Sequence, residues 1–471
     1  MNSAPLERAG AHPSFDALII GAGIAGLETA LDLADQDFQV AIVERRPSIG
    51  GAMIGLSKVF PTLDCSSCIT TPKMAAAAHH PNIAIYTYTE VLSVERRGAV
   101  FSIRLKQKPR YVNEDACIGC RKCEYACPVE VPDEFEEGFG ARRAAYIPFT
   151  NAIPQTALID PQSCILCGRC VTACPTDAVV LDQQPREWQL TARTVVAATG
   201  WQLTPKDAKA EYGSGRITNV ISPTQMERLL APHGPYGRVL RPSDGKVPRS
   251  VAYVQCAGSR DQTLGIPYCS RVCCMYAIKQ AMLLSGSLPF AEITIYYMDI
   301  RAFGKGYEEF YRSAQVMGVE FIKAKVARLT ENADQSVTLR FERIDQYGQV
   351  VERAHDLVVL SLGLTPAQDL THLLLVPTGA DGFAQVPYPK DAPCRTAVEG
   401  VFVAGTATGP KDIVDTIIEA GAAATEASLY LRRTAPRATL GPATKEAPHA
   451  GADASGTLPV PTAAERVPAD A

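Results

Sequence analysis

The chain has 471 residues, of which 46% are hydrophobic and 20% charged, with a formal net charge of −4. This composition fits a globular protein of about three domains, and the slight negative charge gives no reason to expect a nucleic-acid partner. We find no apolar run long enough to span a bilayer and no secretory signal in residues 1–16. Fifteen cysteines without such a signal favour thiolate ligands in the cytoplasm over a disulfide framework.

The first predicted element is a strand over residues 15–20, followed by a glycine-rich turn and a helix. A second strand, over residues 38–43, ends in an acidic residue. In dinucleotide-binding folds the three glycines of such a turn allow a tight bend, a close approach to the pyrophosphate and close helix–strand packing, and the acid binds ribose hydroxyls. The residues that match these roles are Gly21, Gly23, Gly26 and Glu44.

A pair of cysteines, Cys65 and Cys68, follows the Gly50-Gly51 turn of this first unit. Two residues separate them, and three interpretations stay open: a dithiol beside a flavin, a ligand site, or a turn with two buried thiols. Because no further ligand lies nearby in the sequence, we favour a structural or accessory role.

Residues 109–182 form a cysteine-rich insert in which one spacing occurs twice, C-x2-C-x2-C-x3-C-P. This run holds two [4Fe–4S] clusters, and the last cysteine of each run ligates the cluster of the other run. Zinc is the weaker alternative, since a zinc site needs only four thiolates. The insert therefore predicts an electron-transfer protein. The eight predicted ligands are Cys117, Cys120, Cys123, Cys127, Cys164, Cys167, Cys170 and Cys174.

After a strand over residues 194–198, which closes in Thr199-Gly200, a second α/β unit begins with a strand over 251–255. A nucleotide-binding unit would continue with its own glycine turn, but residues 256–261 read CAGSRD. Here the third cysteine group begins. Its spacing is not a standard cluster run, so a further cluster and buried structural cysteines both stay open. The group consists of Cys256, Cys269, Cys273 and Cys274.

This second unit continues with a helix over residues 271–284 and a strand over 293–298. Asp299 follows that strand, at the position where an NAD-binding unit often has an acid that binds the ribose. The alternative is that Asp299 is an ordinary surface residue. The chain then returns to the first fold through a strand over 356–360, the segment 400–405 and a helix over Ile413–Arg433. We predict a dinucleotide-binding domain in three parts (14–108, 183–250 and 353–433), the ferredoxin-like insert (109–182), a second Rossmann-like domain (251–352) and a disordered tail (434–471).

This α/β layout resembles the flavoproteins with two dinucleotide-binding domains that are related to thioredoxin reductase, and within them the A-type subunit of heterodisulfide reductase. The resemblance is carried by the two ferredoxin runs and by the strings LDCSSCITTPK (63–73), YCSRVCC (268–274), DIRAFGKG (299–306) and GPKDI (409–413). It implies FAD, a third [4Fe–4S] cluster on the third cysteine group, and Lys279 as a catalytic residue near the reactive edge of the flavin. Thr406 departs from the broader pattern, which has aspartate there. The implied FAD residues are Gly21, Gly23, Gly26, Glu44, Gly51, Thr199, Gly200, Gly405, Thr406, Lys411 and Asp412.

The resemblance implies an iron–sulfur flavoprotein oxidoreductase subunit. It would pass electrons between ferredoxin, or a hydrogenase or dehydrogenase partner, and the other subunits of a heterodisulfide-reductase-like complex, which act on disulfides or sulfur. A homodimeric core is a further expectation. One alternative is an NAD(P)H-dependent flavoprotein reductase similar to the small subunit of glutamate synthase, against which the missing second glycine turn counts. The other is a non-catalytic electron-transfer scaffold subunit.

Overall fold

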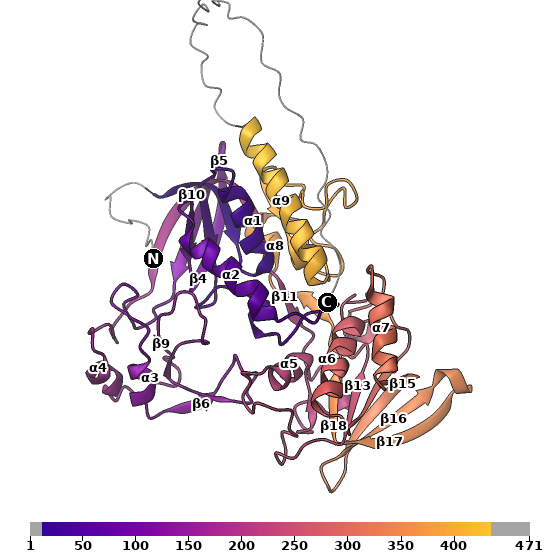
Figure 1. The fold of residues 1–471 in the computed structure, drawn as a ribbon. Coiled ribbons are helices and arrows are strands. Elements are labelled where there is room, and N and C mark those ends of the chain that lie inside the picture. Colours follow the sequence, from indigo (N-terminus) through magenta and orange to yellow (C-terminus); the bar gives the residue numbers. More distant parts are fainter. Residues whose placement is uncertain (1–11, 435–471) are drawn as a thin grey trace, which may run out of the picture. The chain divides into compact units, whose positions relative to one another are not determined.

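The computed structural model describes residues 12–434, and the helices in this range are too short or too polar to cross a membrane. Two large sheets carry the fold (Figure 1). A two-stranded antiparallel ribbon of β11 (Trp201–Leu203) and β19 (Leu364–Pro366) lies in the segments that connect them. The predicted tail begins at residue 434, and all but that first residue lies outside the described residues.

The first sheet has seven strands in the order β3-β2-β1-β10-β5-β4, with β20 also paired to β10. The strands around β1 are parallel, whereas β4, β5 and the first half of β10 are antiparallel. The strands are β1 (Ser14–Ile20), β2 (Val40–Val43), β3 (Ile83–Tyr86), β4 (Thr89–Arg97), β5 (Val100–Gln107), β10 (Arg186–Ala197) and β20 (Val401–Val403).

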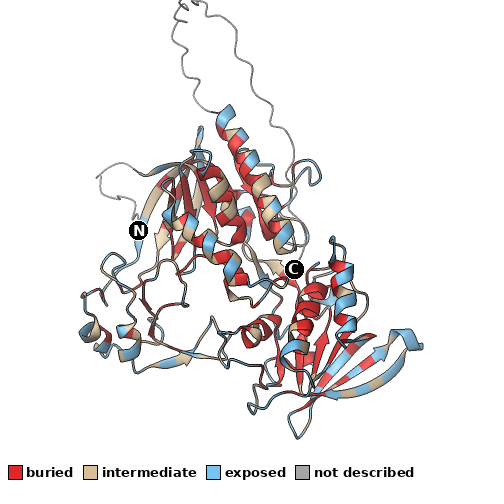
Figure 2. Cartoon of the chain, in the orientation of Figure 1, coloured by how far each residue is buried: buried red, intermediate tan, exposed pale blue. Residues whose placement is uncertain are grey.

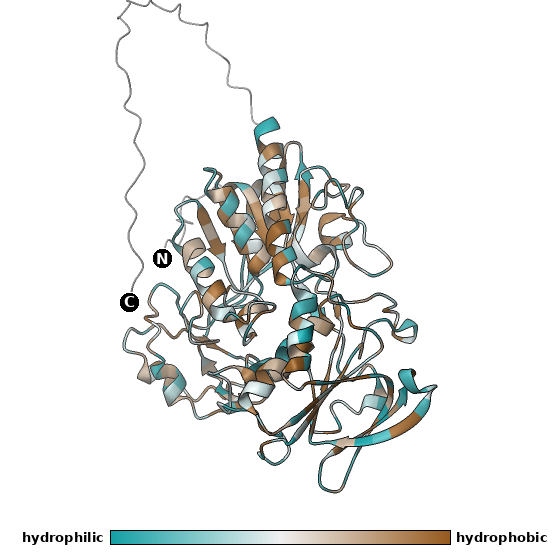
Figure 3. Ribbon diagram, turned by 45° about the vertical axis from the view of Figure 1, so that its right-hand side comes forward, coloured by the Kyte–Doolittle hydropathy of each residue, from teal (hydrophilic) through white to brown (hydrophobic). Residues whose placement is uncertain are grey.

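The carboxyl-terminal parts of β1 and β10 and all of β2 are buried, because both faces of the first sheet are covered there (Figures 2 and 3). Ile19 packs on the helical side, and its neighbours Leu18 and Ile20 pack on the opposite side. This alternation follows from the two-residue period of a strand. The helices of this unit are α1 (Ile24–Ala34), α2 (Ser66–His79), α8 (Leu370–Leu374) and α9 (Ile413–Arg433), with short 3-10 turns η1 (Met53–Gly55) and η5 (Gly405–Thr408).

The cysteine-rich insert leaves the first sheet after β5 and returns to it in β10. It has little regular structure, and its small core consists largely of cysteine and alanine side chains. Its elements are α3 (Lys122–Ala126), β6 (Glu130–Pro132), β7 (Ala141–Arg143), β8 (Ala145–Tyr146), β9 (Leu158–Ile159) and α4 (Arg169–Ala173).

The second sheet has the order β12-β18-β13-β14-β15-β16-β17 and is parallel from β12 to β15. Its strands are β12 (Val220–Ile221), β13 (Ser250–Val254), β14 (Glu292–Tyr297), β15 (Glu320–Glu331), β16 (Val337–Arg343), β17 (Gln349–His355) and β18 (Leu357–Leu360). Its helices are α5 (Pro223–Leu230), α6 (Cys273–Ser287) and α7 (Tyr307–Val316), with 3-10 turns η2 (Ala210–Tyr212), η3 (Gln262–Leu264) and η4 (Ile344–Gln346).

The structure corrects one predicted strand assignment. The sequence pattern predicts that residues 356–360 return to the first fold, but β18 lies between β12 and β13 in the second sheet. All four residues of β18 are apolar and buried, and a fully buried parallel strand carries no signal for the sheet to which it belongs. The boundary at residue 352 is therefore wrong, and β12 and α5 also belong with the second sheet. The other domain boundaries stay predictions.

Candidate functional site

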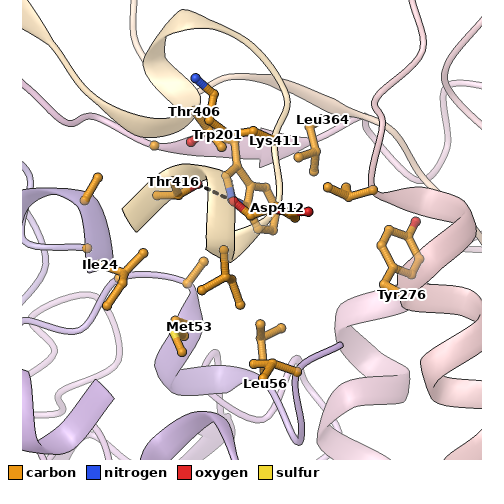
Figure 4. Close-up of a pocket in the computed structure, with 18 of the residues that line it drawn as sticks. Ile24, Met53, Leu56, Trp201, Tyr276, Leu364, Thr406, Lys411, Asp412 and Thr416 are labelled. Carbon is orange, nitrogen blue, oxygen red and sulfur yellow. Dashed lines mark hydrogen bonds between the residues drawn. The ribbon is translucent and has the colours of Figure 1, made fainter. Parts of the chain in front are cut away.

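A large cavity is lined by residues of both sheet units. On the side of the first sheet the lining includes Gly21 and Gly23 after β1, and Glu44 after β2. On the other side it includes Tyr276 (Figure 4) and Lys279, both of which belong to α6. Ten predicted FAD or catalytic residues line this cavity: Gly21, Gly23, Glu44, Gly51, Thr199, Gly200, Lys279, Thr406, Lys411 and Asp412.

Gly26 and Gly405 lie behind the lining and shape it through backbone packing. A Cβ on Gly26 would lie 1.9 Å from the carbonyl oxygen of Gly21. A Cβ on Gly405, whose φ is +64°, would lie 2.8 Å from Cβ of Ala25. Side chains at these positions would push α1 away from β1 and from η5. The turn can therefore hold its shape only with glycine at both positions.

The N-terminus of α1 faces the cavity without a side-chain cap, since Gly23 is its N-cap residue. Its free backbone N–H groups and the helix dipole suit a pyrophosphate. Glu44 is only 6% exposed, and its carboxylate oxygens accept hydrogen bonds of 2.8 Å from the backbone N–H groups of Ala22 and Arg46. The carboxylate is thus fixed at the cavity wall, with lone pairs left for ribose hydroxyls.

Gly51 provides a direct test of this nucleotide cradle. Its φ is +60°, and a Cβ there would lie 2.6 Å from Cα of Gly23. We expect Gly51→Ala to push the two backbone segments apart and to weaken FAD binding by about tenfold or more, a loss of about 1.4 kcal/mol or more, and so to lower the flavin content of the purified protein. Gly55→Ala is the matched control, because a Cβ there meets nothing within 4 Å. Equal flavin content in the two variants would contradict the cradle.

On the opposite side of the cavity, Lys279 of α6 forms an ion pair with Glu227 of α5. Both side chains are buried, with exposed fractions of 2% and 4%. Glu227 also accepts hydrogen bonds from the backbone N–H and hydroxyl of Ser57, at 3.0 and 2.6 Å, and from Gln280 at 2.5 Å. Burial alone would raise the pKa of Glu227, but the Lys279 charge and these hydrogen bonds lower it below its usual range. The carboxylate is therefore ionised and holds the lysine at the cavity.

Asp412 and Lys411 lie at the start of α9, beside Thr406 (Figure 4). Asp412 is the N-cap residue of α9, accepts from the Asp415 N–H at 2.8 Å, and also accepts from the hydroxyl of Tyr307 at 2.5 Å. Lys411 is paired with Glu419 and donates to Thr408 at 2.5 Å. The charge of Lys411 is thus balanced by Glu419 within the protein. Lys411 therefore shapes the cavity wall and does not offer an unpaired positive charge to a ligand.

In the insert, the eight cysteines are divided between two small cavities in the crossed pattern that the spacing predicts. Cys127, the last of the first run, lines one cavity together with Cys164, Cys167 and Cys170. The other cavity is lined by Cys174 together with Cys117, Cys120 and Cys123. Over the described residues, no set of three or more His, Cys, Asp or Glu side chains has the geometry of a site for one metal ion. Thiols arranged around a space fit a multi-atom cluster better than a single ion.

The third cysteine group lies at the carboxyl end of β13, where a nucleotide-binding unit would have its glycine turn. Cys256 follows β13 with a φ of +58°, and Cys273 and Cys274 are the first residues of α6. Burial and the nearby thiols of Cys256 and Cys269 raise the pKa of Cys274 to about 12. The structure thus brings the four predicted ligands together, in a place where thiolates need a bound cation to offset their charge.

This group adjoins the large cavity. Tyr276 lines the cavity, and its hydroxyl donates to the carbonyl oxygen of Leu362 at 2.8 Å. The thiol of Cys273 donates to the same carbonyl oxygen at 3.5 Å. Val272, the neighbour of Cys273 in the chain, also lines the cavity, so the third cysteine group lies beside it. No sequence pattern pointed to Tyr276 or to Glu227, because their partners are distant in the chain.

Asp299, the acid expected at the end of the second unit's strand, is paired with Arg260 and Arg301. The Arg260 guanidinium also lies 3.9 Å from the Cys256 sulfur. Through Arg260, Asp299 is therefore linked to the third cysteine group.

Cys65 and Cys68 do not line any of these cavities, and both are exposed at the start of α2. The alternative of a turn with two buried thiols is therefore wrong for this pair. The sequence could not settle this point, because a short CxxC turn carries no hydrophobic periodicity of its own.

Comparison with known proteins agrees with these sites. Models of 4Fe-4S dicluster domains match residues 116–178 and 156–218, and a model of FAD dependent oxidoreductases matches residues 16–63. The chain is also similar to a thioredoxin reductase structure from T. acidophilum, with a TM-score of 0.50 and 17% identity over 89% of this chain and 98% of that one. This likeness establishes a thioredoxin-reductase-like fold.

Among curated proteins, the chain is 46% identical over 430 residues to the A-type subunit of the H(2):CoB-CoM heterodisulfide,ferredoxin reductase of Methanothermobacter thermautotrophicus. It is 44% identical over 426 residues to the A-type subunit of the Ferredoxin/F(420)H(2)-dependent CoB-CoM heterodisulfide reductase of Methanosarcina acetivorans. These alignments cover 90% and 89% of this chain, but only 65% and 54% of the relatives. The chain thus spans less than two thirds of their length.

Proposed function

The chain belongs to the family of the A-type subunits of heterodisulfide reductase, and we propose that it is an FAD- and iron–sulfur-dependent electron-transfer oxidoreductase subunit with three [4Fe–4S] clusters. FAD would occupy the large cavity, two clusters the insert, and one the third cysteine group. When bound, FAD exchanges electrons in pairs or singly and each cluster carries one electron, so a flavin beside clusters converts between the two modes.

The side chains of this chain would position these groups and shield them from water. The α1 N-terminus, Glu44 and the glycine turn would hold the ADP half of FAD. Lys279 would present its ammonium to the flavin end of the cavity, where a positive charge stabilises an anionic reduced ring. Glu227, held by Ser57 and Gln280, orients Lys279. In this proposal Lys279 is the catalytic residue and Glu227 a positioning residue.

The observation that carries the proposal is the place of the third cysteine group. It lies at the carboxyl end of β13, and Val272 and Tyr276, on either side of Cys273 in the chain, line the cavity. Electron transfer needs short distances between redox centres, whereas a nicotinamide would need a glycine turn at this same point. A cluster here would couple the flavin to one-electron chemistry and would exclude NAD(P)H from the second unit.

We propose that electrons pass between the flavin and the outside through the insert, and that the donor is reduced ferredoxin or a partner protein of the complex. The relatives' names include ferredoxin, H2 and F420H2. The disulfide or sulfur chemistry would take place on partner subunits of a heterodisulfide-reductase-like complex. A homodimeric core is also part of this proposal.

Cofactor analysis of anaerobically purified protein tests the proposal. We expect about twelve iron atoms and as many acid-labile sulfides per chain, as three cubanes require, and about one FAD released on denaturation. A content of only about eight iron atoms per chain in fully loaded protein would refute the third cluster. FMN in place of FAD, or no flavin after reconstitution, would refute the flavin site.

A further inference from the structure

Cys65 and Cys68 stand apart from every site assigned above. The three cysteine groups account for twelve of the fifteen cysteines. Cys394 is fully buried, and its thiol donates to the carbonyl oxygen of Glu419 at 3.3 Å. The two cysteines that remain are both exposed, and they belong to the same first turn of α2.

The two side chains are arranged for reaction with each other. Cys65 is the N-cap residue of α2, and its sulfur accepts a hydrogen bond of 3.4 Å from the backbone N–H of Cys68. The side chain of Cys68 also lies close enough to the sulfur of Cys65 for each thiol to shift the pKa of the other. Cysteines with two intervening residues at a helix start can close a disulfide without moving the helix.

The surroundings make the two thiols unequal. The hydrogen bond from the Cys68 thiol, the backbone N–H groups of Cys68 and Ser67, and the Lys58 ammonium lower the pKa of Cys65. The same thiol–thiol hydrogen bond, together with the nearby Asp64 carboxylate, raises the pKa of Cys68. Lys58 and Asp64 are the charged side chains that act on the pair. Cys65 is thus the better nucleophile near neutral pH, and Cys68 keeps its proton until the second step.

The first turn of α2 is held firmly to the segment that precedes it. The hydroxyl of Ser66 donates to the carbonyl oxygen of Met53 at 2.6 Å, and the N–H of Val59 donates to that of Asp64 at 2.9 Å. Met53 and Val59 line the large cavity, whereas the two thiols face solvent. The pair is therefore fixed in place and open to a molecule that approaches from outside.

We propose that Cys65 and Cys68 form a redox-active dithiol that exchanges with an external disulfide. The Cys65 thiolate attacks one sulfur of the disulfide R–S–S–R, which breaks that bond, forms a mixed disulfide and releases one RS⁻. Cys68 then gives up its proton and attacks the sulfur of Cys65, which closes the Cys65–Cys68 disulfide and releases the second RS⁻. Two electrons pass from the dithiol to the external disulfide, and the two thiol protons end on the two RSH products.

The experiment uses the full chain, reduced with dithiothreitol and desalted under anaerobic conditions. Oxidised glutathione is the probe, and mass spectrometry of peptides is the readout. The wild type should form the Cys65–Cys68 disulfide, and Cys68→Ser should accumulate glutathione on Cys65. Cys65→Ser should react more slowly than Cys68→Ser, because the raised pKa of Cys68 leaves it a smaller thiolate fraction at neutral pH. Lys58→Met should slow the wild-type reaction, with the pH profile moved to higher pH.

Equal reaction rates of Cys65→Ser and Cys68→Ser, or glutathione on Cys68 alone, would overturn the proposal. A loss of about one cluster's iron from either serine variant, without any mixed disulfide, would also overturn it, since the pair would then be ligands. The exchange needs neither flavin nor clusters. Its outcome is therefore separate from that of the cofactor analysis.

Discussion

Cys273→Ala should lose about four of about twelve iron atoms per chain and keep both clusters of the insert, because a cubane needs its four thiolates. Cys273 is 6% exposed at the start of α6, next to Cys274, and lies beside the flavin cavity. Iron and sulfide analysis, together with spectra of the reduced clusters, would measure the loss.

The matched control for this variant is Cys394→Ala. Cys394 is also buried, so its loss leaves a cavity of similar size, but it belongs to no cysteine group. This variant should keep the full iron content. If both variants kept the same iron content, Cys273 would not be a ligand, and the proposal of a third cluster would be refuted.

The second large effect concerns the buried pair of Lys279 and Glu227. We expect Lys279→Met to destabilise the protein by about 3–5 kcal/mol, since it leaves a buried carboxylate without its counter-charge. Adding Glu227→Gln should restore part of this loss, because the glutamine carries no charge and its side-chain oxygen can still accept both hydrogen bonds from Ser57. Denaturation midpoints and flavin retention would measure both variants. Similar midpoints for the wild type and Lys279→Met would contradict a charged pair.

The pH dependence of these variants gives a second readout. In the wild type the pKa of Glu227 is lowered, so its contribution to stability is present above the usual carboxyl pKa of about 4.3 and is lost as the pH falls through the folded value. In Lys279→Met, burial without the ammonium should raise the pKa of Glu227 instead. The instability of that variant should therefore grow from about pH 5 to about pH 8. A merely structural role of Lys279 would give no such slope.

The features that the sequence could locate are local ones. A glycine turn between a strand and a helix, and two runs of four cysteines, each lie within a short stretch of chain. Their spacing fixes which backbone can form, and the crossed arrangement of Cys127 and Cys174 follows from the doubled run. The third group was different, because Cys256 and Cys273 come together only through the turn of β13 into α6. Its spacing alone left two interpretations open.

The features that the sequence could not predict depend on long-range contacts. Glu227 and Lys279 are 52 residues apart, and their pairing depends on how α5 packs against α6. The placement of β18 in the second sheet depends on pairing with β13, about a hundred residues earlier in the chain. In both cases the residue types are ordinary ones, a helix glutamate and a run of aliphatic residues, which fit many positions equally well.

The central claim is that electrons reach the flavin through the insert and not from a nicotinamide. Stopped-flow absorbance of the full chain, mixed with reduced ferredoxin or with NADH or NADPH, tests it most directly. Reduced ferredoxin should bleach the flavin rapidly, Cys120→Ala should slow that reaction, and both nucleotides should reduce the flavin poorly, because the CAGSRD turn at 256–261 offers no glycine cradle for a pyrophosphate. Rapid bleaching by NADH, undiminished in Cys120→Ala, would contradict the claim.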